Sequence, residues 1–201
     1  MNFWTPNDPS ITPAFVLANQ GYDVWLGNNR GNRFAQNHVS LDPSSAEYWR
    51  FSQEEFGLKD LPAFIDHILA KTGQEKLTYI GHSQGTTQMF LGASIDPEYF
   101  KSKVNLFVAL GPVTSLNNIR VKQLKELSKD WKPLEWLFYK EHAFNIFDAN
   151  WAEEDAIQLV CNKLEGICEK AIAWLADSDP KVDNMDRYDV FVADFPAGSG
   201  Y

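Results

Sequence analysis

The sequence is poor in cysteine and in basic residues. Only two of its 201 residues are cysteines, Cys161 and Cys168, too few for a fold held together by disulfides. They are predicted to be two ordinary thiols, although their spacing also permits a bridge. Lys and Arg number 18 against 27 Asp and Glu, which gives a net charge of -9. Because nucleic-acid affinity depends on neutralising phosphates with Lys and Arg, we expect no nucleic-acid partner.

Long apolar runs and targeting signals are also missing. No run approaches the roughly 20 apolar residues that a membrane-spanning helix needs, so no transmembrane segment is expected. Residues 1–9 lack the basic start and apolar stretch of a signal peptide, and no Asn-x-Ser/Thr glycosylation acceptor occurs. No group of His, Cys or carboxylate residues has the spacing of metal ligands. We therefore expect no metal and no cofactor, and the localisation stays open.

What is present is enough apolar material for a core, 44% hydrophobic and 14% aromatic residues. The first half alternates strand-like and helix-like segments, the pattern of an α/β domain with a mainly parallel sheet. Strands are expected at residues 22–26, 77–80 and 104–110, and helices at residues 45–57, 60–72 and 86–94. Asp60 is the expected cap of the second helix, and Gly73 its end.

The motif Gly81-His82-Ser83-Gln84-Gly85 lies between an expected strand and an expected helix. Gly-x-Ser-x-Gly in that context fits a nucleophile elbow, a strained turn that projects the serine hydroxyl away from the sheet. Ser83 is then the candidate nucleophile. The backbone N–H of Gln84, at the start of a helix, is a candidate donor to an oxyanion. The alternative is a glycine-rich turn without chemistry. His82 is a poor candidate for the base, because neighbouring side chains on such a turn point apart.

Four segments together resemble the acid lipase family, which includes gastric and lysosomal lipases: residues 21–28, 30–32, 60–63 and 81–87. The resemblance implies an α/β-hydrolase fold with a helical cap inserted after the strand at residues 104–110. Residues 1–113 would form the N-terminal part of the core, and residues 114–201 the cap. It also implies hydrolysis of acylglycerols or sterol esters, lipid ester substrates, through an acyl-enzyme on Ser83.

Aromatic side chains crowd the expected cap: Trp131, Trp136, Phe138, Tyr139, Phe144 and Phe147. They can form the core of the cap or meet the acyl chain and the lipid surface, and the sequence does not decide between these. In this family one cap disulfide is expected. Cys168 matches one of its partners, whereas Ala176 stands at the place of the other.

In this family the chain order is Ser, then Asp, then His, with both partners on strands beyond the cap. The sequence stops at Tyr201, in a segment that resembles the cap, so the catalytic Asp and His and the C-terminal strands of the core are expected to be absent. A loop that supplies the second oxyanion N–H would precede residue 1. Of the remaining histidines, His38 is expected in a solvated loop, and His67 at the surface of a helix or packed against it. His142, in the cap, is the one conceivable base.

Three interpretations follow from these omissions. The sequence is a fragment of an active lipase, a non-catalytic lipase-like binding or structural subunit in a complex, or a chain whose site a second chain completes. An incomplete sheet exposes an edge and an apolar face, so a protein partner that covers them is expected. The resemblance suggests a lysosomal or secreted protein, which the missing signal peptide and acceptors do not support.

Overall fold

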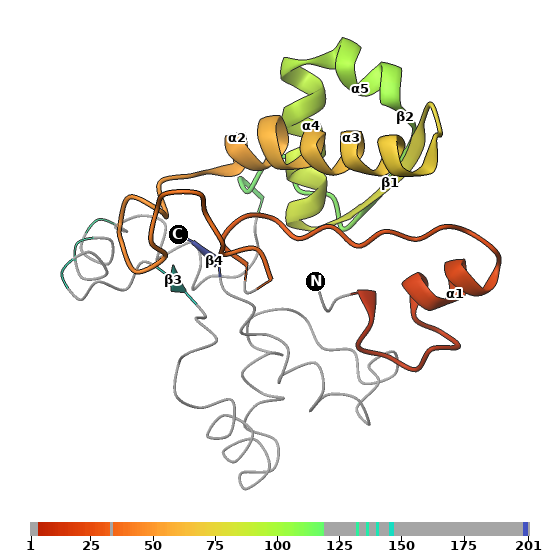
Figure 1. The fold of residues 1–201 in the computed structure, drawn as a ribbon, viewed down its shortest axis with the longest axis horizontal. Helices are drawn as coiled ribbons and strands as arrows, with labels where there is room; N and C mark the ends of the chain where they lie inside the picture. Colours follow the sequence, from red (N-terminus) through yellow and green to blue (C-terminus); the bar gives the residue numbers. More distant parts are fainter. Residues whose placement is uncertain are drawn as a thin grey trace, which may run out of the picture. The chain divides into compact units, whose positions relative to one another are not determined.

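The computed structural model describes residues 4–32 and 34–118, together with residues 132, 136, 140, 145–146 and 199–200 (Figure 1). The chain divides into two compact units, Met1–Phe34 with Asn145–Ser199 and Ala35–Phe144 with Gly200–Tyr201. The described residues also include two strands of two residues each, β3 (Asn145–Ile146) and β4 (Ser199–Gly200). None of the helices described is both long and apolar enough to cross a membrane.

The first unit contains one described helix, α1 (Pro13–Asn19), which begins with a proline directly after Thr12. Thr12 is fully buried, and its hydroxyl donates to the carbonyl of Asp8 at 2.9 Å. The strand predicted at residues 22–26 is wrong, because residues 22–29 have no regular secondary structure. A strand exists only through a ladder of hydrogen bonds to a neighbour, and no ladder forms at these residues.

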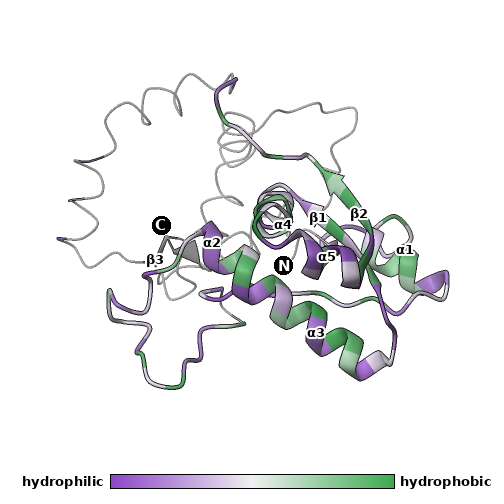
Figure 2. Cartoon of the chain, turned by 90° about the horizontal axis from the view of Figure 1, so that it is seen from above, coloured by the Kyte–Doolittle hydropathy of each residue, from purple (hydrophilic) through white to green (hydrophobic). Residues whose placement is uncertain are grey.

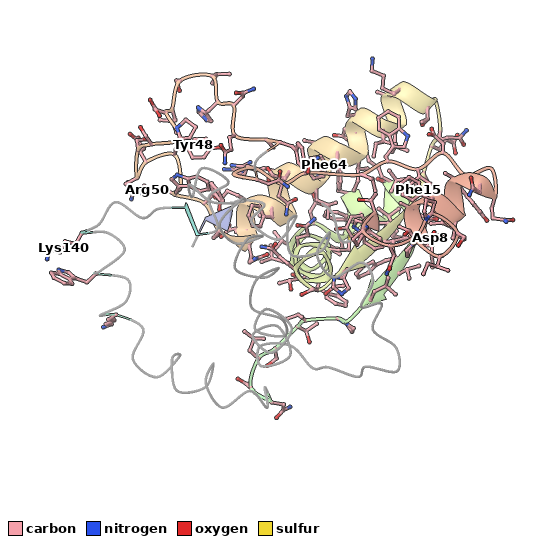
Figure 3. All side chains as sticks on the ribbon, turned by 90° about the horizontal axis from the view of Figure 1, so that it is seen from below. Asp8, Phe15, Tyr48, Arg50, Phe64 and Lys140 are labelled. Atoms are coloured by element: carbon pink, nitrogen blue, oxygen red, sulfur yellow. The ribbon has the colours of Figure 1, made fainter. Side chains whose placement is uncertain are left out.

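The helix predicted at residues 45–57 is wrong over its first half. Residues 43–49 form turns, and α2 (Gln53–Glu55) begins only after Ser52. Tyr48 and Trp49 are buried in this loop, and the Trp49 indole donates to the carbonyl of Pro43 at 2.7 Å. Figure 3 shows Tyr48 on the loop that leads into α2. The side-chain packing of the loop therefore replaces the helix that the sequence pattern favoured.

Three helical segments follow one another as one rod, α2, the π-helical turn η2 (Phe56–Asp60) and α3 (Leu61–Thr72) (Figure 1). The N-cap predicted at Asp60 does not form, because η2 runs directly into α3 and leaves Asp60 helical and buried. The predicted end is confirmed: Gly73 takes the left-handed conformation with φ 69°. α3 buries Leu61 and Ile65, one helical turn apart, and exposes other positions, as an amphipathic helix does; apolar and polar residues both colour it in Figure 2.

The rest of the second unit carries the sheet. β1 (Leu77–His82) is followed by α4 (Gln84–Ile95), α5 (Pro97–Lys103) and β2 (Val104–Leu110). β1 and β2 are parallel, so the predicted strand, helix and strand are confirmed. The helix α5 was not predicted, although Asp96 caps it by accepting from the Tyr99 N–H and Pro97 stands at its first position.

The core of this unit joins three helices to the strand pair. Leu61 and Ile65 of α3, Met89 of α4 and Phe100 of α5 are buried together. α4 also lies very close to η2, because a Cβ on Gly92 would be 2.7 Å from the Gly57 carbonyl oxygen. This packing fixes α4 against β1, and the turn between them carries Ser83.

Candidate active site

Ser83 occupies the turn between β1 and α4, and its backbone is strained. Its φ is 49° and its ψ is -114°, and it is the one non-glycine residue with positive φ in the part of the chain that the structure describes. Such conformations cost on the order of 1–3 kcal/mol and persist only where the surroundings enforce them. The residue is exposed. A strained, exposed serine between a strand and a helix is the geometry of a nucleophile elbow.

The first glycine of the motif, Gly81, makes this turn sterically possible. A Cβ on Gly81 would lie 2.7 Å from the carbonyl oxygen of Gly85, closer than any real side chain allows. Gly81 has no positive φ, so the requirement here is space and not backbone freedom. β1 and the first turn of α4 therefore touch through their backbones, and Ser83 is forced outward between them.

Backbone hydrogen bonds hold both sides of Ser83. Its N–H donates to the Leu110 carbonyl at the end of β2 at 3.0 Å, which extends the β1–β2 ladder by one step. Its carbonyl accepts from the Thr86 N–H at 2.9 Å and from the Thr86 hydroxyl at 2.6 Å. Among the residues that the structure describes, the Ser83 hydroxyl makes no hydrogen bond.

Gln84 is the first residue of α4 and is exposed. The first N–H groups of a helix have no acceptor within the helix, and the helix dipole adds partial positive charge there. The N–H of Gln84 is therefore placed to donate to negative charge that develops beside Ser83. Its role as an oxyanion donor remains a proposal.

A buried polar link supports the elbow from below, and the sequence analysis missed it. The Tyr79 hydroxyl donates to the Gly85 carbonyl at 2.9 Å and accepts from the Gln88 side-chain amide at 2.9 Å. Gln88 is only 4% exposed. Burial raises the pKa of Tyr79 to about 12, and the Gln88 hydrogen bond opposes this rise in part. The signal in the sequence was a glutamine among the apolar residues of the helix.

The histidines differ in their surroundings. The Nδ1 atom of His38 accepts from the N–H groups of Ser40 and Leu41 at 3.1 and 2.9 Å, so this histidine organises a turn. His67 lies exposed on α3. His82 is also exposed, and its Nε2 atom is 3.9 Å from where a Cβ on Gly111 would lie. His142 lies outside the described residues.

Little of the expected cap can be compared with the structure. Trp136, a helical residue, is 62% exposed, and the Lys140 ammonium lies 5.1 Å from the centre of its ring. The other aromatic residues expected there lie outside the described residues, as do Cys161 and Cys168. Among the described residues, no group of three His, Cys, Asp or Glu side chains could hold a metal ion.

Comparison with known proteins adds the family context. Residues 9–132 match the sequence profile of the alpha/beta hydrolase fold. Lipase member K of Mus musculus is 42% identical over 203 residues, which cover 98% of this chain and 49% of that protein. Gastric triacylglycerol lipase of Homo sapiens is 38% identical over 205 residues, with the same two coverages. Lipase lipl-3 of Caenorhabditis elegans is 37% identical over 205 residues, also covering 98% of this chain and 49% of that protein. The chain therefore spans about half the length of these relatives.

Proposed function

Because the chain belongs to the acid lipases of the α/β-hydrolase fold family, we propose that it serves the hydrolysis of lipid carboxylic esters with Ser83 as nucleophile. The observation that carries this proposal is the strained backbone of the exposed Ser83 between β1 and α4. Strain of this kind is retained where it serves function, because a relaxed turn would fold at lower cost.

In the proposed reaction the Ser83 Oγ attacks the ester carbonyl carbon and its proton passes to a base. The alcohol leaves with a proton from that base, and the acyl group stays on Ser83 until water releases it as a fatty acid. The N–H of Gln84 donates to the oxyanion that forms in each step. Since the Ser83 hydroxyl bonds to none of the described residues, we expect the base to lie outside them. The family resemblance implies a histidine oriented by an aspartate.

The proposed substrates are acylglycerols or sterol esters, which the names of the relatives suggest in part. One of them is called a triacylglycerol lipase. A net charge of -9 does not oppose a neutral lipid substrate, because such a lipid carries no charge to be neutralised. The exposed Trp136 provides one apolar surface of the kind that lipid contacts use.

The test is covalent labelling with a fluorophosphonate probe, on the full natural protein and on the 201-residue chain beside it. We expect labelling that Ser83→Ala abolishes, since an activated serine is the group that such a probe captures. Ser94→Ala is the matched control, because Ser94 lies in the last turn of the same helix, is exposed, and its hydroxyl donates to the Leu91 carbonyl. A titration of fatty acid released from triacylglycerol and cholesteryl ester emulsions then separates the two substrate classes.

Equal labelling of the parent and Ser83→Ala would overturn the role of Ser83. A folded natural protein that does not label at all would overturn the catalytic proposal and favour a non-catalytic lipase-like subunit. Labelling of the natural protein but not of the 201-residue chain would leave Ser83 as the nucleophile and show that its base lies outside this chain.

A further inference from the structure

Two threonines of α4 hold the segment that leaves β2. Thr86 is fully buried, and its hydroxyl donates to the Ser83 carbonyl at 2.6 Å and accepts from the Val113 N–H at 2.9 Å. The Thr87 hydroxyl donates to the Val113 carbonyl at 2.9 Å. Both polar groups of the Val113 backbone are therefore satisfied by neighbouring side chains of one helix.

The Thr86 hydroxyl has a single hydrogen, so its two bonds require different roles. It gives that hydrogen to Ser83 and uses an oxygen lone pair for Val113. With both roles fixed, the hydroxyl has one orientation. In a buried site a lost partner is costly, because the remaining group cannot turn to water.

The path of the chain explains how these groups meet. After β2 ends at Leu110, Gly111 takes a left-handed conformation with φ 55°, and Val113 then lies against α4. The Leu110 carbonyl already accepts from the Ser83 N–H. The end of β2 therefore holds the N–H of Ser83 directly, through the Leu110 carbonyl. Val113 holds the carbonyl of Ser83 indirectly, through the Thr86 hydroxyl.

We propose that Thr86 is a positioning residue for Ser83, and that Thr86 and Thr87 together tie the start of the segment after β2 to the nucleophile elbow. The positioning of Ser83 for reaction rests on the proposed function, whereas the tie itself does not.

The experiment uses four variants of the natural protein. Thr86→Val removes the hydroxyl at nearly constant volume, and Thr86→Ser keeps it. Thr87→Val removes the second bond. Thr78→Val is the matched control, because the Thr78 hydroxyl also joins β1 to β2, by donating to Asn105 at 3.0 Å among exposed side chains.

Two readouts are measured for each variant. Amide hydrogen exchange reports on the N–H groups of Ser83 and Val113, and the thermal midpoint corrects for global stability. Fluorophosphonate labelling gives the rate constant of inactivation separately from the affinity for the probe. A purely structural role would lower the thermal midpoint and leave the inactivation rate of the folded fraction unchanged.

We expect Thr86→Val to speed exchange at Val113 by at least about tenfold and to slow inactivation by about tenfold, with unchanged probe affinity. Thr86→Ser restores both, Thr87→Val loosens the segment around Val113 with less effect on inactivation, and Thr78→Val changes neither. If Thr86→Val does not fold, Thr86→Cys is used in its place. The cysteine thiol is a weaker donor than the threonine hydroxyl, so intermediate effects are expected.

Unchanged exchange at Val113 in Thr86→Val or Thr86→Cys would overturn the tie. Faster exchange at Val113 with an unchanged inactivation rate would overturn the positioning role. If the parent does not label, the proposed function fails by itself. Exchange at the Val113 amide then decides the tie, because Thr86→Val removes the acceptor of that N–H. The Ser83 amide, which donates to the Leu110 carbonyl, is the internal reference.

Discussion

Two short apolar runs of this molecule, each followed by a glycine, end in different structures. Residues 22–26 precede Gly27 and form no regular structure, whereas residues 77–80 precede Gly81 and belong to β1. The tyrosines of the two runs show the contrast. Tyr22 is 66% exposed, whereas the hydroxyl of Tyr79 is enclosed between Gly85 and Gln88.

The difference arises from what surrounds each run. β1 has β2 as a hydrogen-bonded neighbour and α4 packed against it, and its glycine touches the first turn of that helix. No ladder forms at residues 22–29. A run of apolar residues therefore becomes a strand only when its backbone groups find partners, since unpaired N–H and C=O groups cannot be buried cheaply. Three changes test how far this contrast extends.

The largest effect is expected when alanine replaces a glycine beside each run: Gly81, which follows residues 77–80, and Gly21, which precedes residues 22–26. Gly81→Ala places a Cβ 2.7 Å from the Gly85 carbonyl, so the backbone of the elbow must move, and we expect a loss of about 2–3 kcal/mol in the free energy of unfolding. Gly21→Ala meets nothing within 4 Å, and only its φ of 89° opposes the side chain, at about 1 kcal/mol. Urea unfolding of both variants measures the two losses. Equal losses would contradict the contrast.

How much of the fold could be predicted follows the same division. β1, α4 and β2 were predictable because a run of apolar residues, the helical spacing and the glycines of the motif are local signals. The bounds predicted for β2, residues 104–110, agree with the structure. The segments at residues 22–26 and 45–52 were mispredicted, because their conformations depend on contacts that no local pattern encodes.

The candidate site divides in the same way. The position of Ser83 could be predicted from five consecutive residues. The Tyr79–Gln88 link and the bonds of Thr86 to Ser83 and Val113 could not, because each needs the parallel pairing of β1 and β2 and the packing of α4 to bring the partners together. A hydroxyl on a strand and an amide on a helix are compatible with many other arrangements.

A smaller effect is expected when each tyrosine loses its hydroxyl. Tyr79→Phe removes the hydroxyl that accepts from the buried Gln88 amide and donates to the Gly85 carbonyl, and the loss of these two bonds costs about 1–2 kcal/mol of unfolding free energy. Tyr22→Phe changes an exposed side chain and should stay within about 0.5 kcal/mol. Urea denaturation of both variants, followed by circular dichroism, makes the comparison.

A double variant sharpens this test. Because the Tyr79 hydroxyl and the Gln88 amide bond to each other, Tyr79→Phe combined with Gln88→Met should lose less than the sum of the two single losses. If Tyr22→Phe cost as much as Tyr79→Phe, or if the double variant lost the sum of both single losses, the buried link would not be the source of the difference.

The smallest effect concerns alkaline pH, and it isolates the same hydroxyl. Burial raises the pKa of Tyr79 in the folded protein to about 12 from an ordinary value of 10.0. Its contribution to stability is therefore fully present below pH 10 and is lost as pH rises from 10 towards 12, because the unfolded chain releases this proton first. At pH 11 the loss is on the order of 1 kcal/mol.

Tyr79→Phe lacks this contribution, so its unfolding free energy should fall less steeply than that of the parent between pH 10 and 11.5. Between pH 7 and 9 the two curves should run parallel, which serves as the internal control. Curves that stay parallel up to pH 11.5 would mean that water reaches the Tyr79 hydroxyl, and the contrast between the two tyrosines would then be one of packing alone.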